Sequence, residues 1–157
     1  MSSEKLSSHY DVNYILIAIR AQIEDYQFAY FLNKSPFFLF QRMEEDVSYV
    51  IDNSSIYFSS FYDSNEDLKR TSFLLKNRAL HNSEININNG LFATGPIDSV
   101  VFLVPELREF DYFIKLVGIW KNDEISTLRM LLKNMKMVES EISVNLNKLK
   151  SINNLIF

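Results

Sequence analysis

The sequence predicts a single α+β domain over residues 1–157, with a mostly antiparallel sheet and two main helices on one of its faces. The chain of 157 residues has the usual length of one domain, and its 47% of hydrophobic residues can fill a core. Only three glycines and three prolines interrupt it, which favours long regular elements. Segments with strand patterns outnumber the two with helical spacing. Because two helices cannot cover both faces of a large sheet well, we expect both on one face of a two-layer domain.

The first strand and the first helix are predicted near the N-terminus. Residues 12–20, VNYILIAIR, are rich in β-branched side chains and apolar on both faces, which is typical of a central strand. A helix follows over about residues 22–34, where Glu24 and Asp25 suit the positive end of the helix dipole. Pro36 disfavours helical geometry at the residue before it and therefore marks the end of this helix.

The middle of the chain, residues 37–80, has the pattern of β structure with polar connections. FFLFQRM and VSYVI are strand candidates, and SIYFSSFY and RTSFLLK flank the turn-rich DSNEDLK as a hairpin would. Residues 82–97, NSEININNGLFATGPI, hold four asparagines together with two glycines and a proline. This composition predicts a flexible Asn/Gly-rich loop.

The C-terminal part predicts two strands, a helix and a last strand. Residues 99–104 have the composition of a buried strand, and residues 110–117 alternate between two faces. A helix follows over about residues 123–137, with an inward face formed by Ile125, Leu128, Leu131, Leu132 and Met135. The alternation of VESEISV, residues 138–144, predicts a strand with Val138, Ser140, Ile142 and Val144 inward and Glu139, Glu141 and Ser143 outward.

A proline-containing corner joins the two strands predicted before the second helix. Pro105 lacks a backbone N–H for a strand ladder, so it fits the end of a strand. Residues 106–109 form a short polar link, after which the chain can return as the neighbouring antiparallel strand. Glu106 and Asp111 lie near this corner.

At this corner the sequence resembles the IPExxxVDY family of Bacteroidota, which is named for its signature. Residues 104–112 read VPELREFDY, and the matching positions are Pro105, Glu106, Asp111 and Tyr112. Val104 and Phe110 stand where the signature has isoleucine and valine, so both positions stay apolar.

Two further stretches carry the resemblance. EDYQFAYFLNK at residues 24–34 and NKLKSINNLIF at residues 147–157 are similar to family members, so the likeness spans nearly the whole chain. The family has no assigned activity, and the resemblance therefore implies no mechanism. In flavobacteria its members tend to be encoded near ribonuclease III, acyl carrier protein and pyruvate kinase.

The composition excludes several kinds of site. The chain has no cysteine, so it has no disulfide, no thiolate nucleophile and no thiolate metal ligand. Its apolar runs are too short to span a bilayer and its N-terminus lacks the pattern of a signal peptide, so we expect a cytoplasmic protein without membrane contact. His9 and His81 each fit a surface position better than a catalytic or metal-binding one. We expect no catalytic residue, no metal and no cofactor.

Carboxylates, aromatic rings and the apolar tail supply the remaining candidates. Glu106 and Asp111 are the best carboxylate pair, and we favour a structural role for the signature residues, because carboxylates at corners commonly accept backbone N–H groups. Phe113 beside Lys115 would stack nucleic-acid bases on an exposed face, but aromatic residues at strand spacing are more often core. The tail is expected to dock on the domain or on a second copy, and otherwise to be presented to a partner, through Leu155, Ile156 and Phe157.

These observations favour a non-enzymatic cytoplasmic protein that works through protein–protein contact, as an interaction or adaptor module and either as a monomer or as a homodimer. Residues 68–157 carry 12 basic and 9 acidic side chains, whereas residues 1–67 carry 4 and 11. This basic half and the gene neighbourhood keep an RNA-associated accessory factor, in RNA processing or translation, as the first alternative. The net charge of −4 makes nucleic acid the less favoured partner. The second alternative is a small-ligand binder or enzyme that uses Glu106 and Asp111.

Overall fold

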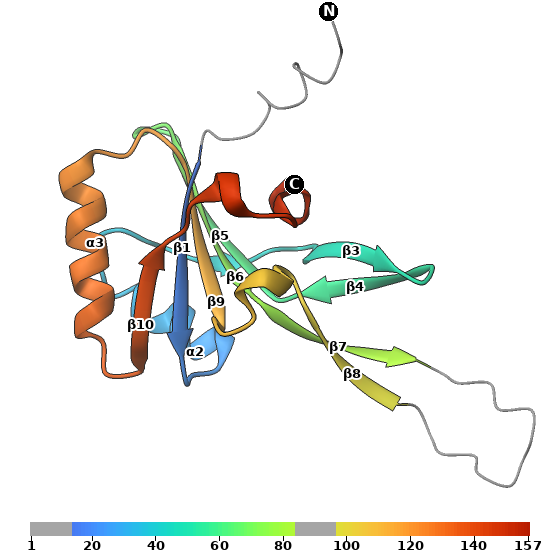
Figure 1. The fold of residues 1–157 in the computed structure, drawn as a ribbon. Helices are drawn as coiled ribbons and strands as arrows, with labels where there is room; N and C mark the ends of the chain where they lie inside the picture. Colours follow the sequence, from blue (N-terminus) through green and yellow to red (C-terminus); the bar gives the residue numbers. More distant parts are fainter. Residues whose placement is uncertain (1–13, 84–96) are drawn as a thin grey trace, which may run out of the picture.

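A six-stranded antiparallel sheet forms the centre of the molecule (Figure 1). The computed structural model describes residues 14–83 and 97–157 of the chain. The strands follow the order β10-β1-β9-β6-β5-β2. Their bounds are β1 Tyr14–Ala21, β2 Gln41–Arg42, β5 Ser60–Asn65, β6 Arg70–Lys76, β9 Tyr112–Gly118 and β10 Val138–Ser143. The predicted first strand is β1, which is apolar because it is paired on both edges and buried on both faces.

Two helices, α2 (Asp25–Leu32) and α3 (Asn122–Asn134), pack on one face of this sheet, which we call the helix face. Their fully buried side chains are Phe28 and Leu32 of α2 and Leu128 and Leu132 of α3. They contact apolar side chains of β1, β6 and β9. The prediction of an α+β domain with both helices on one face is confirmed.

Both helices are shorter than predicted. α2 begins at Asp25 because the residues before it continue from β1 in extended form, with a ψ of 151° at Glu24. The N–H of Gln22 donates to the carbonyl of Met137, which ties this link to the chain before β10. α3 ends at Asn134 because Met135 is already extended, with a ψ of 131°.

Two hairpins lie outside the main sheet and project from it (Figure 1). The first pairs β3 (Val47–Ile51) with β4 (Ser54–Phe58). The second pairs β7 (Arg78–Ser83) with β8 (Ile97–Phe102). Asp52 and Asn53 take positive φ angles at the turn of the first hairpin, as the two residues of a tight hairpin turn do.

The pattern predicted for residues 37–80 holds with two differences. VSYVI forms β3, and β5 and β6 form the predicted hairpin around DSNEDLK. SIYFSSFY is divided at Ser59 between β4 and β5, which belong to different sheets. Only Gln41–Arg42 of FFLFQRM is a strand, because the side chain of Asn33 takes the backbone N–H and the carbonyl of Phe40.

The opposite face of the sheet, the far face, is covered by a hairpin and by segments whose only helical parts are short 3₁₀ turns in the described residues. The first hairpin, the corner after β8 and the C-terminal segment pack there against Ala18, Leu75 and Phe113. The buried residues that these covering segments contribute are Val47, Ile56, Phe58, Leu103, Val104, Phe110, Leu146 and Leu155. The sheet is therefore covered on both faces, with regular helices on one and mostly irregular segments on the other.

The strand pair predicted over residues 99–104 and 110–117 is wrong in its pairing. β8 pairs with β7 in the second hairpin, whereas β9 pairs with β1 and β6 in the main sheet. Val100 is 52% exposed, so β8 is not a buried strand. The 3₁₀ turn at Pro105–Leu107 redirects the chain from the hairpin into the main sheet.

The faces predicted for the last strand are wrong at Ser140, which is exposed, and at Glu141 and Ile142. Glu141 is buried on the helix face, where Arg129 of α3 donates to its carboxylate from Nε at 2.8 Å and from a terminal nitrogen at 3.1 Å. Ile142 is instead 38% exposed.

A bulge in β10 explains this exchange. Between Arg20 and Ala21 of β1 the paired residue moves from Ser140 to Val138, so Glu139 is an extra residue in the ladder. An extra residue reverses the alternation beyond it. Val138 and Glu141 consequently share the helix face although they are three residues apart.

Two other predictions concern membranes and the long loop. No helix among the described residues is long and apolar enough to cross a membrane. Of the loop predicted over residues 82–97, residues 84–96 lie outside the described part of the chain. Asn82, Ser83 and Ile97 belong to the second hairpin.

Candidate functional site

The signature corner, residues 104–112, is fixed to the sheet by Asn77, which lies between β6 and β7. Asn77 is fully buried, and its carboxamide accepts from the Val104 N–H at 2.9 Å. The same carboxamide donates to the carbonyls of Leu107 at 3.0 Å and Phe110 at 2.9 Å. One side chain thus satisfies three backbone groups of a segment that has no ladder of its own.

Glu106 connects the signature corner to the C-terminal segment. Its carboxylate accepts the backbone N–H groups of Lys150 at 2.6 Å and Ser151 at 2.7 Å, and the Ser151 hydroxyl at 2.6 Å. Desolvation acts to raise the pKa of Glu106, but these hydrogen bonds outweigh it and hold the pKa below its ordinary value. The side chain remains exposed, so it acts as a surface tether.

Asp111 and Tyr112 connect the corner instead to the end of β1 and to the link between β1 and α2. Asp111 accepts the Ala21 N–H at 2.9 Å on one oxygen and Arg78 at 3.2 Å on the other. The Tyr112 hydroxyl donates to the Ile23 carbonyl at 2.5 Å, and burial raises the pKa of this phenol. Both side chains therefore hold the link that follows β1.

The structure does not bring Glu106 and Asp111 into one site. They have no hydrogen-bonding partner in common, since Glu106 contacts the C-terminal segment and Asp111 contacts β1 and β7. Pro105 begins the 3₁₀ turn between them. The pair considered as one chemical site from the sequence is thus divided between two sides of the corner.

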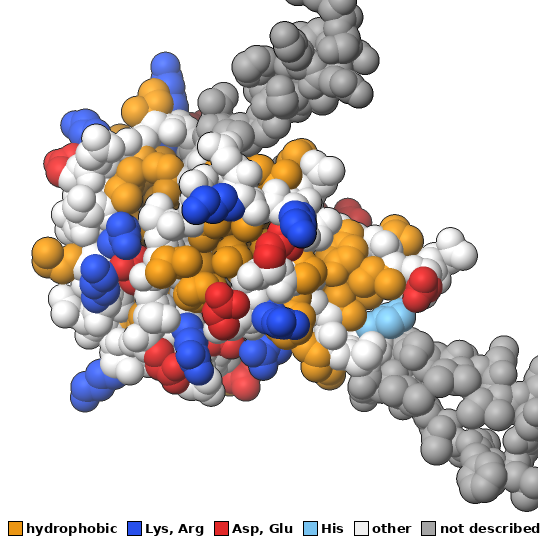
Figure 2. Space-filling view, viewed as in Figure 1, with side chains coloured by type: hydrophobic (Ala, Val, Ile, Leu, Met, Phe, Trp, Pro, Cys, Tyr) orange, Lys and Arg blue, Asp and Glu red, His pale blue; other side chains and the backbone are white. Residues whose placement is uncertain are grey.

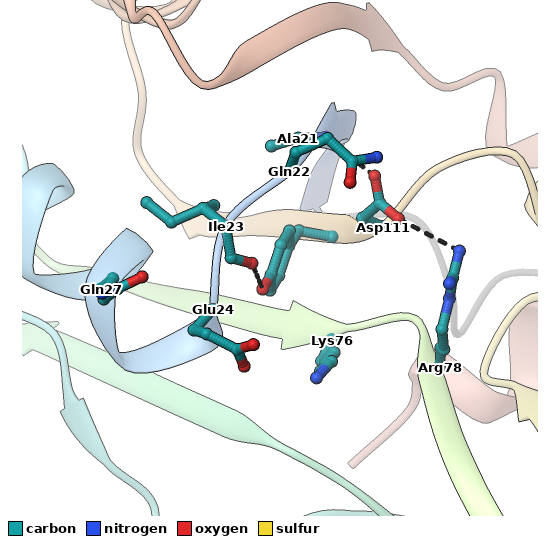
Figure 3. Close-up of a pocket in the computed structure, with 9 residues that line it drawn as sticks. Ala21, Gln22, Ile23, Glu24, Gln27, Lys76, Arg78 and Asp111 are labelled. Atoms are coloured by element: carbon teal, nitrogen blue, oxygen red, sulfur yellow. Dashed lines mark hydrogen bonds and ion pairs between the residues drawn. The ribbon is translucent and has the colours of Figure 1, made fainter.

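A cleft of about 420 Å³, the polar cleft, opens beside Asp111 (Figure 3). It lies where the link from β1 to α2 faces the end of β6 and the start of β7. Its charged and amide side chains are Gln22, Glu24, Gln27, Lys76, Arg78 and Asp111. In Figure 3 the carboxylate of Glu24 and the ammonium of Lys76 extend from different elements into the same space.

Sequence reasoning found only part of this cleft. Asp111 was a candidate through the signature, and Glu24 appeared only as a helix-start residue. Lys76 and Arg78 carried no signal in LLKNRAL, because the antiparallel pairing of β6 with β9 is what brings them beside Asp111. Asn77, between them, was also missed, and its one visible sign is a polar residue between two apolar runs.

A second concavity of about 390 Å³, the hairpin groove, lies between the two projecting hairpins. Its exposed apolar side chains are Tyr57 of β4, Leu80 of β7 and Val100 of β8, which are 54%, 70% and 52% exposed. Lys76 and Arg78 border this groove as well as the polar cleft. Figure 2 shows hydrophobic side chains open to solvent toward the end of the molecule from which the hairpins project.

The C-terminal tail is ordered and partly docked. Leu155 is fully buried on the far face, and its carbonyl accepts the ammonium of Lys115 at 2.6 Å. Phe157 packs edge-on against Phe73, and the Lys115 ammonium lies 4.1 Å from the centre of the Phe157 ring. Phe157 is 48% exposed despite this contact and Ile156 is 56% exposed, so of the three tail residues only Leu155 is fully docked.

The aromatic and basic pair considered for nucleic acid, Phe113 and Lys115, does not form a stacking platform. Phe113 is fully buried and Lys115 is 6% exposed, so this pair belongs to the core. Desolvation lowers the pKa of Lys115 to about 8. Three of the arginines in the basic half pair with carboxylates, namely Arg70 with Glu124, Arg78 with Asp111 and Arg129 with Glu141.

Metal-binding chemistry has no candidate in the described part of the chain. No group of three or more histidine and carboxylate side chains that could hold a metal ion occurs there. His81 lies in β7, on a projecting hairpin, and His9 lies outside the described residues.

The chain matches no family model, no curated protein and no solved structure. The function therefore has to be argued from the geometry of the described residues.

Proposed function

We propose that the protein is a non-enzymatic interaction module that binds a protein partner in the hairpin groove. The observation that carries this proposal is the exposure of Tyr57, Leu80 and Val100 along one concave surface. Apolar side chains that line a hollow gain most when a partner removes them from water, at about 25 cal/mol for each Å² buried. The hairpins also offer strand edges to an incoming extended chain.

The charges around the groove indicate what kind of partner fits. Arg42, Lys76 and Arg78 border it together with one carboxylate, Asp46. Arg42 is paired with Asp46 and Arg78 with Asp111, while Lys76 has no such contact among the described ion pairs. An extended segment that carries both an apolar side chain and a carboxylate complements this lining.

The roles of the signature residues favour binding over catalysis. Glu106, Asp111 and Tyr112 are committed to backbone groups of other segments, as a scaffold requires. A general acid or base instead needs a free proton-accepting or proton-donating group beside a substrate. The proposed cytoplasmic location rests on the sequence, and fractionation of cells of the source organism tests it.

We also propose that the chain is a member of the IPExxxVDY family, because its three similar stretches meet at the signature corner. The ring of Tyr112 packs at a tilt of 60° against Phe28 of the stretch at residues 24–34, with ring centres 5.0 Å apart. Glu106 contacts Lys150 and Ser151 of the stretch at residues 147–157. Stretches that contact one another in the folded chain have to fit together, so the three similar stretches belong to one part of the same fold. Structures of accepted members test this assignment, since a different contact pattern at the corner would contradict it.

Substitution in the groove tests the interaction. Leu80→Ser combined with Val100→Ser removes two apolar anchors, and Ile119→Ser combined with Met130→Ser is the matched control at residues that are 66% and 64% exposed elsewhere. We expect the groove variant to weaken partner binding about tenfold or more, and the control to leave it unchanged. The wild type and both variants are cross-linked in the source organism and then captured, and the amount of partner bound to each is compared.

Light scattering of the purified variants completes this test. A dimeric wild type that becomes monomeric in the groove variant would identify a second copy of the chain as the partner. Equal capture and equal mass for the wild type and both variants would overturn the proposal.

A further inference from the structure

The polar cleft contains two classes of polar side chain. Asp111 and Tyr112 form its inner wall and are committed to Ala21, Arg78 and Ile23. The side chains of Gln22, Glu24, Gln27 and Lys76 make no hydrogen bond or ion pair among those recorded for the described residues. The frame of the cleft is thus fixed, and its remaining polar groups are available to a ligand.

The available charges in the cleft are opposite in sign and separate. Glu24 lies before α2, and Lys76 lies at the end of β6. They line the same space without forming an ion pair with each other. Arg78 donates to Asp111 through one nitrogen only, so its other N–H groups supplement Lys76 on the cationic side.

This arrangement selects against ligands that carry a single charge. A simple anion would be attracted by Lys76 and Arg78 but repelled by the nearby carboxylates. A simple cation would be attracted by Glu24 and Asp111 but repelled by the nearby basic groups. A molecule with a carboxylate and an ammonium satisfies both sides at once. The neighbouring carboxamides of Gln22 and Gln27 can donate to or accept from either group.

We propose that the polar cleft binds a small zwitterion of the amino-acid type, either a free α-amino acid or a short peptide. Arg78 and Lys76 hold the carboxylate, and Glu24 accepts the ammonium. The volume of about 420 Å³ lies in the range of small-molecule sites. Because Glu24, Gln22 and Gln27 are exposed, the expected dissociation constant is about 0.01–1 mM. The polar cleft shares Lys76 and Arg78 with the border of the hairpin groove, but Gln22, Glu24 and Gln27 line the cleft and not the groove, and the proposal does not depend on the proposed function.

NMR titration of the full chain with free L-amino acids tests the proposal. The panel covers acidic, basic, polar, aliphatic and aromatic side chains, together with alanylalanine. We expect at least one of these to shift the backbone amides of Gln22, Glu24, Lys76 and Arg78 in a saturable way. The tightest ligand is then compared with its analogue that lacks the ammonium and its analogue that lacks the carboxylate, each of which should bind about tenfold more weakly.

Variants separate this site from the fold, and Glu24→Gln also separates it from the groove, because Glu24 lines the cleft and not the groove. Glu24→Gln should weaken binding about tenfold while melting like the wild type, because the Glu24 side chain makes no hydrogen bond or ion pair in the described part of the chain. Lys76→Met should weaken binding to a similar extent and melt slightly below the wild type, because Lys76 also attracts the carboxylate of Asp25. Leu80→Ser is the matched control, and it should leave zwitterion binding unchanged even if it abolishes partner capture.

Three results would overturn the proposal. One is the absence of saturable shifts up to about 20 mM of every ligand in the panel. Another is equal affinity for an analogue with a single charge, which would make the cleft a simple anion or cation site. The third is unchanged affinity in both Glu24→Gln and Lys76→Met.

Discussion

The two faces of the sheet are held by different kinds of contact. On the helix face, apolar side chains pack from two helices whose backbone groups are largely satisfied within each helix. On the far face, the covering segments are mostly irregular, and Asn77, Glu106 and Lys115 make hydrogen bonds to their backbone groups. Irregular cover requires such polar anchors, because buried backbone groups must be bonded.

The largest expected effect comes from the anchor of the signature corner. Asn77→Ala leaves backbone groups of Val104, Leu107 and Phe110 without partners, so we expect the free energy of unfolding to fall by about 3–5 kcal/mol. Urea denaturation measures this loss. Asn33→Ala is the matched control on the helix face, where a partly exposed asparagine holds only Phe40, and it should cost about 1–2 kcal/mol. Equal losses in the two variants would contradict the contrast between the faces.

Removal of the tail should be the next largest effect. Deletion of residues 155–157 takes the buried Leu155 from the far face and the carbonyl acceptor from Lys115, at a cost of about 2–4 kcal/mol. Thermal melting measures the loss, and light scattering detects any change in mass. Ile156→Ser, at an exposed position, is the control and should melt like the wild type. An unchanged melting temperature in the truncated protein would show that the tail does not hold the far face.

The third prediction is a pH dependence that belongs to the far face. Desolvation lowers the pKa of Lys115 to about 8 from its ordinary 10.5. Between these values the unfolded chain holds a proton that the folded protein has released, so the free energy of unfolding should rise with pH. We expect a gain of about 1–2 kcal/mol between pH of about 7.5 and about 10. Above that, Tyr112 acts in the opposite direction, because burial raises the pKa of its phenol.

Lys115→Met provides the control for this pH dependence. A methionine fits the apolar surroundings but cannot titrate, so the rise in the free energy of unfolding should disappear in urea titrations at matched pH. A variant that keeps the rise would assign it to another group.

The smallest expected losses in the free energy of unfolding come from substitution of the two signature carboxylates, Asp111 and Glu106. The Asp111 side chain is 18% exposed and holds the Ala21 N–H, so Asp111→Asn should cost about 1–2 kcal/mol. Glu106 is exposed, so Glu106→Gln should cost less than about 1 kcal/mol and mainly speed hydrogen exchange at Lys150 and Ser151. Exchange measured at these two amides checks the local role. If their exchange is unchanged, Glu106 does not tether the C-terminal segment.

The helix face was more predictable from the sequence than the far face. The spacing of apolar residues in α3 and β1 is a local property, and it identified their buried side chains Ile17, Leu128 and Leu132 without knowledge of their neighbours. The face of Glu141 depends on a bulge that exists only in the pairing of β10 with β1, so no periodicity within β10 could reveal it.

The candidate sites were less predictable for the same reason. The signature singled out Asp111 and Glu106, but their partners come from segments far away in the chain, such as Arg78 and Ser151. Asn77 has no pattern around it, because its role is to satisfy three backbone groups whose position is set by the whole fold.

The position of β1 in the sheet also determines the order in which the protein can be assembled. β1 is the first described strand of the chain, and both its neighbours, β9 and β10, come from the last third. Until those strands have been synthesised, the apolar residues 15–19 have unpaired backbone groups along two edges. Pairing across so long a stretch of chain is slow, and an exposed strand of this kind aggregates readily. Residues 14–21 are therefore open to unwanted pairing until β9 has been synthesised, and one edge of β1 stays open until β10 follows.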